Sequence, residues 1–325
     1  MMNDKKPLII ITGPTAVGKT DLSINIAKAV NGEIISADSM QVYRHMDIGT
    51  AKIRPEEMQG IPHHLIDCLE PCEEFNIYLF QQMALRAVDD ILSRGKMPVI
   101  VGGTGFYIQS VLKDVDFSDE EKNTAYREYL RKIAEEQGAN VLHDMLFKTD
   151  PAAAKKIHAN NVKRVIRALE YHEQTGGKIS EHNEAESKKD SPFDYLYFVI
   201  NNERSVLYAR IEKRIDNMMA DGLVEEVKRL RKLGCTRDMV SMKGLGYKEI
   251  LAYLDGDLSL EEAVYIIKRD TRHFAKRQIT WFKREEDVIW MNYPDFNNNK
   301  ELMQEAMLRK IGEHYGKDIS TAWNQ

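Results

Sequence analysis

The chain of 325 residues is long enough for one large domain with an insertion or for two domains of ordinary size. Its 43% hydrophobic and 30% charged residues exclude intrinsic disorder, and its net charge of −5 means that any nucleic-acid-binding surface has to be local. The apolar runs are too short for a membrane span or a signal peptide, and three cysteines argue against a disulfide framework, so we expect a cytoplasmic protein.

The first third of the chain alternates between strand and helix patterns. A glycine-rich turn and the helix-stopping pair Asn31-Gly32 separate the first elements. The expected elements are strands at Pro7–Thr12, Glu33–Ala37, His64–Leu69 and Met97–Val101, with helices at about Lys19–Val30 and Phe75–Arg94. This alternation predicts an α/β fold with a parallel sheet and right-handed crossovers.

The pattern changes near Lys113. Charged amphipathic stretches then predict helices at Ser118–Gln137, Val141–Lys148, Pro151–His158 and Val162–Gln174, and Ser118 followed by Glu121 predicts a capping box at the start of the first. Glu181–Ser191 is polar and predicts a loop, whereas Tyr195–Asn201 predicts another strand of the sheet. We therefore expect residues 1–113 and 195–325 to form an α/β core that ends in C-terminal helices, with residues 114–194 as an all-helical insertion; two sequential domains are the alternative.

Residues 13–20 carry the strongest chemical signal. They match the pattern G-x-x-x-x-G-K-[ST] in full, between an apolar strand and a helix, as this phosphate-binding loop requires. The glycines let backbone N–H groups converge on phosphate oxygens, and the helix N-terminus adds partial positive charge. We expect a diphosphate or nucleotide site, with Mg²⁺ on the Thr20 hydroxyl, formed by Gly13, Pro14, Thr15, Ala16, Val17, Gly18, Lys19 and Thr20.

Two polar residues follow predicted strands of the same sheet. Asp38 comes directly after Glu33–Ala37, and Thr104 follows Met97–Val101 and two glycines. Because the carboxyl ends of parallel strands face the ligand crevice, both side chains are expected beside the loop. Asp38 could bind magnesium-bound water or accept a proton from a nucleophile, while the alternative for each residue is an N-cap.

Three basic elements are the next signal. Between Lys268 and Arg284 there are seven Lys or Arg and one acid, and the spacing predicts a helix over Glu261–Arg284 with a basic face opposite an apolar stripe. Such a face is typical of contact with a phosphate backbone, a solvated charged face being the alternative. Further clusters lie at residues 163–167 and 241–248, where Tyr247 in a glycine-flanked turn could stack on a base.

The loop alone leaves three functions open. These are an ATP-dependent kinase of a nucleotide or small alcohol, a transferase that holds a diphosphate leaving group, and a nucleic-acid-binding ATPase or switch without group transfer. Three basic elements beside a phosphate loop favour a large anionic substrate over a metabolite.

The ordered set of motifs resembles one family, the P-loop tRNA dimethylallyltransferases. The resemblance extends from Gly13 to about Trp290. It is carried by GPTAVGKT at 13–20, ISADSMQVYRHMDIGTAK at 35–52, PHHLID at 62–67, VGGTGFY at 101–107, KRVIRALE at 163–170, RIDNMMADGLVEEV at 214–227, KGLGYKE at 243–249 and KRQITWF at 276–282. One departure is Asn160-Asn161-Val162, where relatives often carry a proline, which bears on how a helix begins and not on the chemistry.

The resemblance implies a reaction. The exocyclic amine of the adenosine on the 3′ side of the anticodon attacks dimethylallyl diphosphate and expels diphosphate. Asp38 matches the family's general base, Thr104 shares the catalytic edge, and Arg214 matches a diphosphate-binding arginine, although by itself it could be an ordinary surface arginine. Mg²⁺ is the expected cofactor.

The resemblance also implies the residues that hold tRNA. The helical insertion would contact the anticodon stem, and the chain is expected to act as a monomer without a membrane or protein partner. No zinc site is expected at His64, Cys68 and Cys72, because a fourth ligand is missing. The implied tRNA contacts are Asp38, Ser39, Met40, Gln41, Thr104, Arg127, Lys163, Arg164, Val165, Ile166, Arg167, Lys243, Gly244, Leu245, Gly246, Tyr247, Lys248, Lys276, Arg277, Gln278, Ile279, Thr280, Trp281, Phe282 and Lys283.

Overall fold

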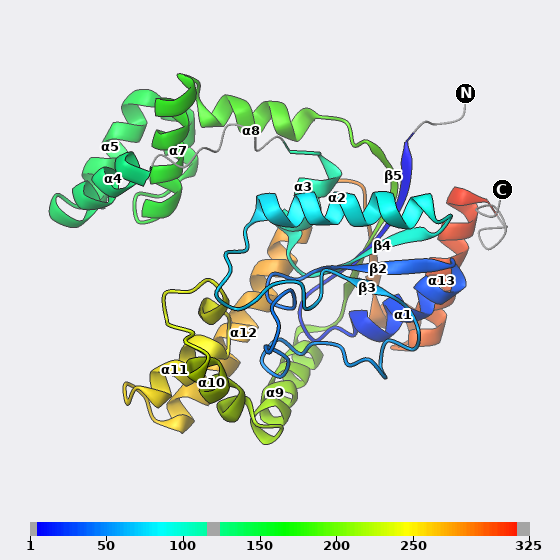
Figure 1. The fold of residues 1–325 in the computed structure, drawn as a ribbon. Coiled ribbons are helices and arrows are strands. Elements are labelled where there is room, and N and C mark those ends of the chain that lie inside the picture. Colours follow the sequence, from blue (N-terminus) through cyan, green and yellow to red (C-terminus); the bar gives the residue numbers. More distant parts are fainter. Residues whose placement is uncertain (1–4, 116–123, 317–325) are drawn as a thin grey trace. The chain divides into compact units, whose positions relative to one another are not determined.

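A six-stranded sheet organises most of the chain, for which a computed structural model describes residues 5–115 and 124–316. The strand order is β3-β2-β4-β1-β5-β6, and every neighbouring pair is parallel (Figure 1). The strands are β1 Lys6–Thr12, β2 Gly32–Ala37, β3 His63–His64, β4 Met97–Gly102, β5 Phe193–Asn201 and β6 Val288–Asn292. The predicted α/β fold with a parallel sheet is therefore confirmed.

The chain forms two compact units. One consists of the residues up to Val111 and those from Phe193 onward, and the other is Leu112–Pro192, so the second unit interrupts the first. The helices of the first unit are α1 Lys19–Ala29, α2 Ile77–Ser93, α3 Gly105–Leu112, α9 Arg204–Ala220, α10 Leu223–Lys232, α11 Tyr247–Leu254, α12 Leu260–Phe282 and α13 Lys300–Tyr315, with 3₁₀ turns η1 Ser241–Lys243 and η2 Tyr293–Phe296.

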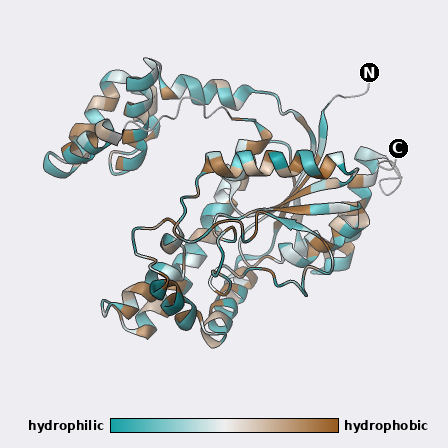
Figure 2. Ribbon diagram, in the orientation of Figure 1, coloured by the Kyte–Doolittle hydropathy of each residue, from teal (hydrophilic) through white to brown (hydrophobic). Residues whose placement is uncertain are grey.

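The sheet core explains why the strands read as continuous apolar runs. Figure 1 shows α2 on one side of the sheet and α1 and α13 on the other, so that both faces are covered. Leu8, Ile9, Ile10 and Ile11 of β1 are accordingly all fully buried. Figure 2 shows hydrophobic residues concentrated in these strands, whereas the helices carry both hydrophobic and hydrophilic residues.

The second unit is a small helical domain with its own core. Leu130, Leu142, Leu146 and Val165 are among its fully buried residues. Its helices are α4 Thr124–Glu136, α5 Ala139–Thr149, α6 Pro151–Lys156, α7 Val162–Thr175 and α8 Ile179–Lys188. The predicted capping box at Ser118 and Glu121 lies outside the described residues.

Two expected elements were wrong. The strand expected at His64–Leu69 stops after His64, because Leu65 and Asp67 adopt left-handed backbone conformations with φ of 62° and 52°. The loop expected at Glu181–Ser191 is mostly helix α8, since the buried Asp150 carboxylate accepts hydrogen bonds from both the backbone N–H and the hydroxyl of Ser180 in its first turn.

Three further findings bear on location and ligands. Within residues 5–115 and 124–316, no helix is both long and apolar enough to cross a membrane. Cys68, Cys72 and Cys235 are free thiols. In the same described part of the chain, no group of three or more His, Cys, Asp or Glu side chains is arranged to hold a metal ion.

Candidate active site

The glycine-rich loop between β1 and α1 has the backbone that a phosphate cradle needs. Gly13 has a φ of 147°, and a Cβ there would lie 2.2 Å from the carbonyl oxygen of Ile200. Gly18, at the N-cap of α1, has a φ of 100°. Only glycine adopts these conformations without strain, so Gly13 and Gly18 set the shape of the loop. As a result, the N-terminus of α1 points toward the loop.

Lys19 is the main cation of the loop. Its Nζ donates hydrogen bonds to the carbonyl oxygens of Gly13 at 3.0 Å and Pro14 at 2.9 Å. Burial, together with the positive charge of Arg214, lowers the pKa of Lys19 to about 7, while the negative charge of Asp38 acts in the opposite direction. These three groups therefore form one electrostatic cluster, in which a bound anion would stabilise the protonated lysine.

Two arginines on one face of α9 contact the loop from outside. Arg214 donates from Nη1 to the hydroxyl of Thr15 at 3.5 Å, and Arg210 donates from Nη1 to the carbonyl oxygen of Val17 at 3.2 Å. The Arg210 guanidinium also lies over the ring of Tyr293 at 5.6 Å. Burial lowers the pKa of Arg214 from its ordinary value, and the negative charge of Asp38 partly offsets this effect. A bound anion would stabilise the positive charge of Arg214 further.

Asp38 lies at the carboxyl end of β2 and opens a turn, not a helix. Its Oδ1 accepts hydrogen bonds from the backbone N–H of Met40 at 2.8 Å and of Gln41 at 3.3 Å. Its Oδ2 has no hydrogen-bond partner among the residues that the structure describes. The turn thus fixes the carboxylate through one oxygen and leaves the other for a ligand. Thr104 directly precedes α3, and its carbonyl oxygen accepts hydrogen bonds from the N–H groups of Tyr107 and Ile108 in the first turn of that helix.

Gln278 of α12 joins the loop to the turn that carries Thr104. Its Oε1 accepts the N–H of Thr15 at 2.9 Å, and its Nε2 donates to the carbonyl oxygen of Gly103 at 2.9 Å. The side chain is 6% exposed. Both polar ends of this side chain are engaged by the α/β unit, and the contact of Gln278 with tRNA that the resemblance implies stays a prediction. No feature of the sequence marks this different role, because the partners of the amide lie on other elements.

A second buried polar group, Glu226 of α10, holds the segment after Asp38. Its carboxylate accepts hydrogen bonds from the N–H groups of Asp47, Ile48 and Gly49 at 2.8–3.1 Å, and from the hydroxyl of Tyr247 at 2.7 Å. Sequence reasoning did not single out Glu226. The expectation that Tyr247 stacks on a base was wrong, because this side chain is 1% exposed and packs against Gly49.

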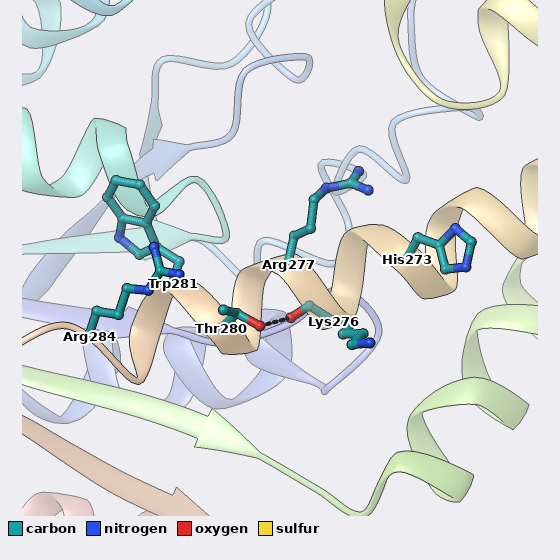
Figure 3. A pocket seen from close by; sticks show the side chains of 6 residues that line it. All are labelled: His273, Lys276, Arg277, Thr280, Trp281 and Arg284. Carbon is teal, nitrogen blue, oxygen red and sulfur yellow. Dashed lines mark hydrogen bonds between the residues drawn. The ribbon is translucent and has the colours of Figure 1, made fainter. Parts of the chain in front are cut away.

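The basic side of α12 borders a cavity of about 490 Å³ (Figure 3). Its lining residues are His273, Lys276, Arg277, Thr280, Trp281 and Arg284. Of the other residues expected in this segment to hold tRNA, Lys283 is exposed, Ile279 is half-buried and Phe282 is fully buried.

The basic face of α12 has fewer unpaired cations than the sequence predicted. Arg272 pairs with Glu212 at 2.7 Å, and Lys268 pairs with Asp216 at 2.5 Å. Both acids belong to α9, so part of the basic face is neutralised by a neighbouring helix, and the exposed cations gather at the C-terminal half. The sequence pattern on one helix could not show this pairing.

The remaining expected tRNA contacts divide into exposed and internal groups. At the 243–248 turn, Lys243 and Lys248 are exposed, Gly244 and Leu245 are half-buried, and Gly246 is buried. Near the loop, Ser39, Met40 and Gln41 are half-buried. The Met40 side chain lies against Gly244, where an added Cβ would be 2.6 Å from its terminal carbon, so the two segments are in close contact.

In the helical unit, the expected contacts are split between surface and core. Lys163, Arg164 and Arg167 of α7 are exposed, whereas the side chains of Val165 and Ile166 are buried in the domain core. Contact of this segment with tRNA stays a prediction. Arg127 of α4 makes a bidentate ion pair with the buried Glu170, with contacts of 2.6–3.0 Å. This pair fixes α4 against α7, which is a structural role for Arg127.

The parallel sheet and its glycine loop, with Lys19, Arg214 and Asp38 around it, define a P-loop protein with a polar reaction centre beside the phosphate site. Comparison with known proteins narrows this class. The family model described as IPP transferase matches residues 41–285, and that described as isopentenyl transferase matches residues 6–70. The chain belongs to the IPP transferase family, that of the tRNA dimethylallyltransferases.

Individual relatives agree with this membership. The chain is 59% identical over 302 residues to the tRNA dimethylallyltransferase of Lachnoclostridium phytofermentans, covering 93% of this chain and 96% of the relative. It is 50% identical over 306 residues to that of Carboxydothermus hydrogenoformans, covering 94% and 96%.

Two solved structures are also similar. The tRNA isopentenylpyrophosphate transferase of Bacillus halodurans has a TM-score of 0.71 at 44% identity, covering 96% of this chain and 98% of that one. A eukaryotic dimethylallyltransferase, described as acting on tRNA, has a TM-score of 0.77 at 35% identity, covering 88% and 74%.

Proposed function

We propose that this protein transfers the dimethylallyl group of dimethylallyl diphosphate to the exocyclic amine of the adenosine on the 3′ side of the anticodon in tRNA. The observation that carries the proposal is the cluster of Lys19, Arg214 and Asp38 at the glycine loop, in a chain 59% identical to a tRNA dimethylallyltransferase. The cations suit a diphosphate leaving group, and the carboxylate suits a proton acceptor.

The donor's diphosphate would occupy the loop of residues 13–20. Backbone N–H groups and the α1 N-terminus supply partial positive charge, and Lys19 and Arg214 supply full charges. As the bond between the first prenyl carbon and the bridging oxygen breaks, negative charge accumulates on diphosphate. Cations already held in place stabilise this charge more in the transition state than in the ground state.

Asp38 would act as the general base. The adenosine nitrogen attacks the first carbon of the prenyl chain, the carbon–oxygen bond breaks with its electron pair leaving on diphosphate, and the proton of the amine passes to the Asp38 carboxylate. The hydrogen bonds from Met40 and Gln41 to Oδ1 orient the carboxylate, and Oδ2 is the oxygen that would take the proton. Thr104, at the end of the neighbouring β4, would flank the acceptor base.

Mg²⁺ fits the residues at the loop. Thr20 is exposed in the first turn of α1, which suits a hydroxyl ligand, and the described residues offer no carboxylate cage that would bind the ion alone. Mg²⁺ prefers one or two protein ligands together with substrate phosphates and water, so Thr20 would hold it on the donor. When bound, the ion supplies additional neutralisation of the diphosphate charge.

The acceptor would lie on exposed basic residues. These are Lys276, Arg277 and Lys283 on α12, Lys243 and Lys248 before and within α11, and Lys163, Arg164 and Arg167 on the helical unit. Their positive charge suits the phosphates of an RNA strand. Action in the cytoplasm is part of the same proposal, supported by the free thiols of all three cysteines, and so is action as a monomer.

A transfer assay tests the proposal directly. The protein is incubated with Mg²⁺, dimethylallyl diphosphate labelled in its prenyl group, and total tRNA, with Asp38→Ala as a matched control that keeps the loop cations. Label should enter tRNA with the native protein and enter about 10²–10⁴ times more slowly with the variant. Label that stays out of tRNA, while ATP is consumed with a small alcohol or nucleotide acceptor, would establish a kinase instead.

A further inference from the structure

Helix α12 faces two different parts of the candidate site on two of its sides. One side lines the cavity with Lys276, Arg277 and Thr280 (Figure 3), the surface on which the proposed function places RNA. Another side carries Gln278 to the glycine loop, in which the donor's diphosphate would lie. The same short stretch of one helix thus touches the acceptor surface and the donor loop.

The Gln278 side chain suits a brace because it has both a donor and an acceptor. Its Oε1 accepts a hydrogen bond from the N–H of Thr15 in the loop, and its Nε2 donates one to the carbonyl oxygen of Gly103, each at 2.9 Å. The contact is close: a Cβ on Gly103 would lie 2.2 Å from the Gln278 nitrogen. The Thr15 hydroxyl also accepts a hydrogen bond from Arg214, and Gly103 directly precedes Thr104. The Gln278 amide therefore sets the distance between the donor loop and the turn beside the acceptor.

We propose that Gln278 is a positioning residue that couples RNA binding on α12 to donor binding in the loop. RNA that binds the basic side of α12 restricts the helix, and the restricted helix holds Thr15 and Gly103 at the spacing that the donor needs. The inference rests on the proposed function, because it takes the occupants of both surfaces from it. Coupling of this kind is reciprocal: RNA raises the affinity for diphosphate, and diphosphate raises the affinity for RNA by the same factor.

The chain offers a matched control. Arg210 also supports the loop, by donating a hydrogen bond to the carbonyl oxygen of Val17. However, Arg210 belongs to α9 and is not among the residues that line the cavity beside α12. Arg210→Met therefore loosens the loop without breaking the connection to α12. Gln278→Met keeps the length of the side chain and removes both hydrogen bonds, whereas Gln278→Glu keeps the bond from Thr15 and loses the donor to Gly103.

The test is a titration of inorganic pyrophosphate, with Mg²⁺, into the full chain in the absence and presence of an anticodon stem-loop RNA. For the native protein, RNA should raise the pyrophosphate affinity by about 5- to 150-fold, the usual range of such couplings. In Gln278→Met and Gln278→Glu the factor should fall below about 2-fold, whereas Arg210→Met should weaken pyrophosphate binding with and without RNA while keeping the native factor.

Two results would overturn the inference. One is a native factor of one, and the other is a native factor that persists in the Gln278 variants, which would leave only a structural role for this residue. If Gln278→Met fails to fold, Gln278→Glu decides the matter. Failure of the proposed function is seen separately, in a native protein that transfers no dimethylallyl group to tRNA.

Discussion

Replacing Glu226 by glutamine tests how firmly the segment after Asp38 is held. The Glu226 carboxylate is 1% exposed and accepts four hydrogen bonds, two on each oxygen: Asp47 and Ile48 N–H on Oε2, and Gly49 N–H with the Tyr247 hydroxyl on Oε1. An amide keeps one oxygen, and its nitrogen then faces two donors. The tyrosine hydroxyl can rotate and accept from this nitrogen, but the backbone N–H cannot.

The expected magnitude follows from this geometry. One buried N–H left without an acceptor costs about 1–3 kcal/mol, and the two remaining bonds lose the strength they had with a charged acceptor. Glu226→Gln should therefore lower the free energy of unfolding by about 2–4 kcal/mol. Glu226→Ala leaves all four donors without an acceptor and should lower the free energy of unfolding more than Glu226→Gln does. Tyr247→Phe should lower it less, by about 1.5–3 kcal/mol.

Two assays measure this effect. Urea unfolding gives the stability change, and native-state hydrogen exchange reports the amides of Asp47, Ile48 and Gly49 individually, which should lose protection in Glu226→Gln while the amides of β1 keep theirs. A stability loss below about 0.5 kcal/mol, the size of a neutral surface substitution, would refute the reasoning from the four bonds. Unchanged protection of the three amides would do so equally.

Three further predictions concern the reaction. Asp38→Asn should slow transfer by about 10²–10⁴-fold while RNA affinity changes little, and equal losses in both would remove Asp38 from the base role. Because the pKa of Lys19 is lowered to about 7, the lysine loses its charge above this pH, and pyrophosphate affinity should decline there by up to ~10-fold per pH unit. The Lys19→Arg variant keeps its charge at every pH and should lack this decline. A parallel decline in both proteins would contradict the assignment. Lys276→Ala and Arg277→Ala should each reduce the salt dependence of tRNA affinity by about one unit of slope, and an unchanged slope would argue against phosphate contacts on α12.

The sequence predicted the parts of the fold that depend on local pattern. Apolar runs marked β1, β2, β4 and β5, and helical periodicity marked α5 and α7 within a few residues. It failed where conformation depends on distant partners. The strand expected at His64–Leu69 ends at positive φ, and α8 depends on Asp150, which is about thirty residues earlier and reaches Ser180 only in the folded domain.

The candidate site shows the same division. The loop at residues 13–20 and Asp38 were found from spacing, because glycine geometry and strand ends are local properties. Glu226 and the role of Gln278 were missed, since a carboxylate or amide in a helix gives no sign of the backbone groups that it will meet. Burial of Tyr247 was missed for the same reason: its partner lies on another helix.

The position of the transferred group is the most direct test of the central claim. After reaction with labelled dimethylallyl diphosphate, the tRNA is digested with nucleases and the labelled nucleoside is located by mass spectrometry. The account predicts label on the exocyclic amine of a single adenosine on the 3′ side of the anticodon, with one diphosphate released per group transferred. Label on another nucleotide, or diphosphate release without any labelled RNA, would contradict it.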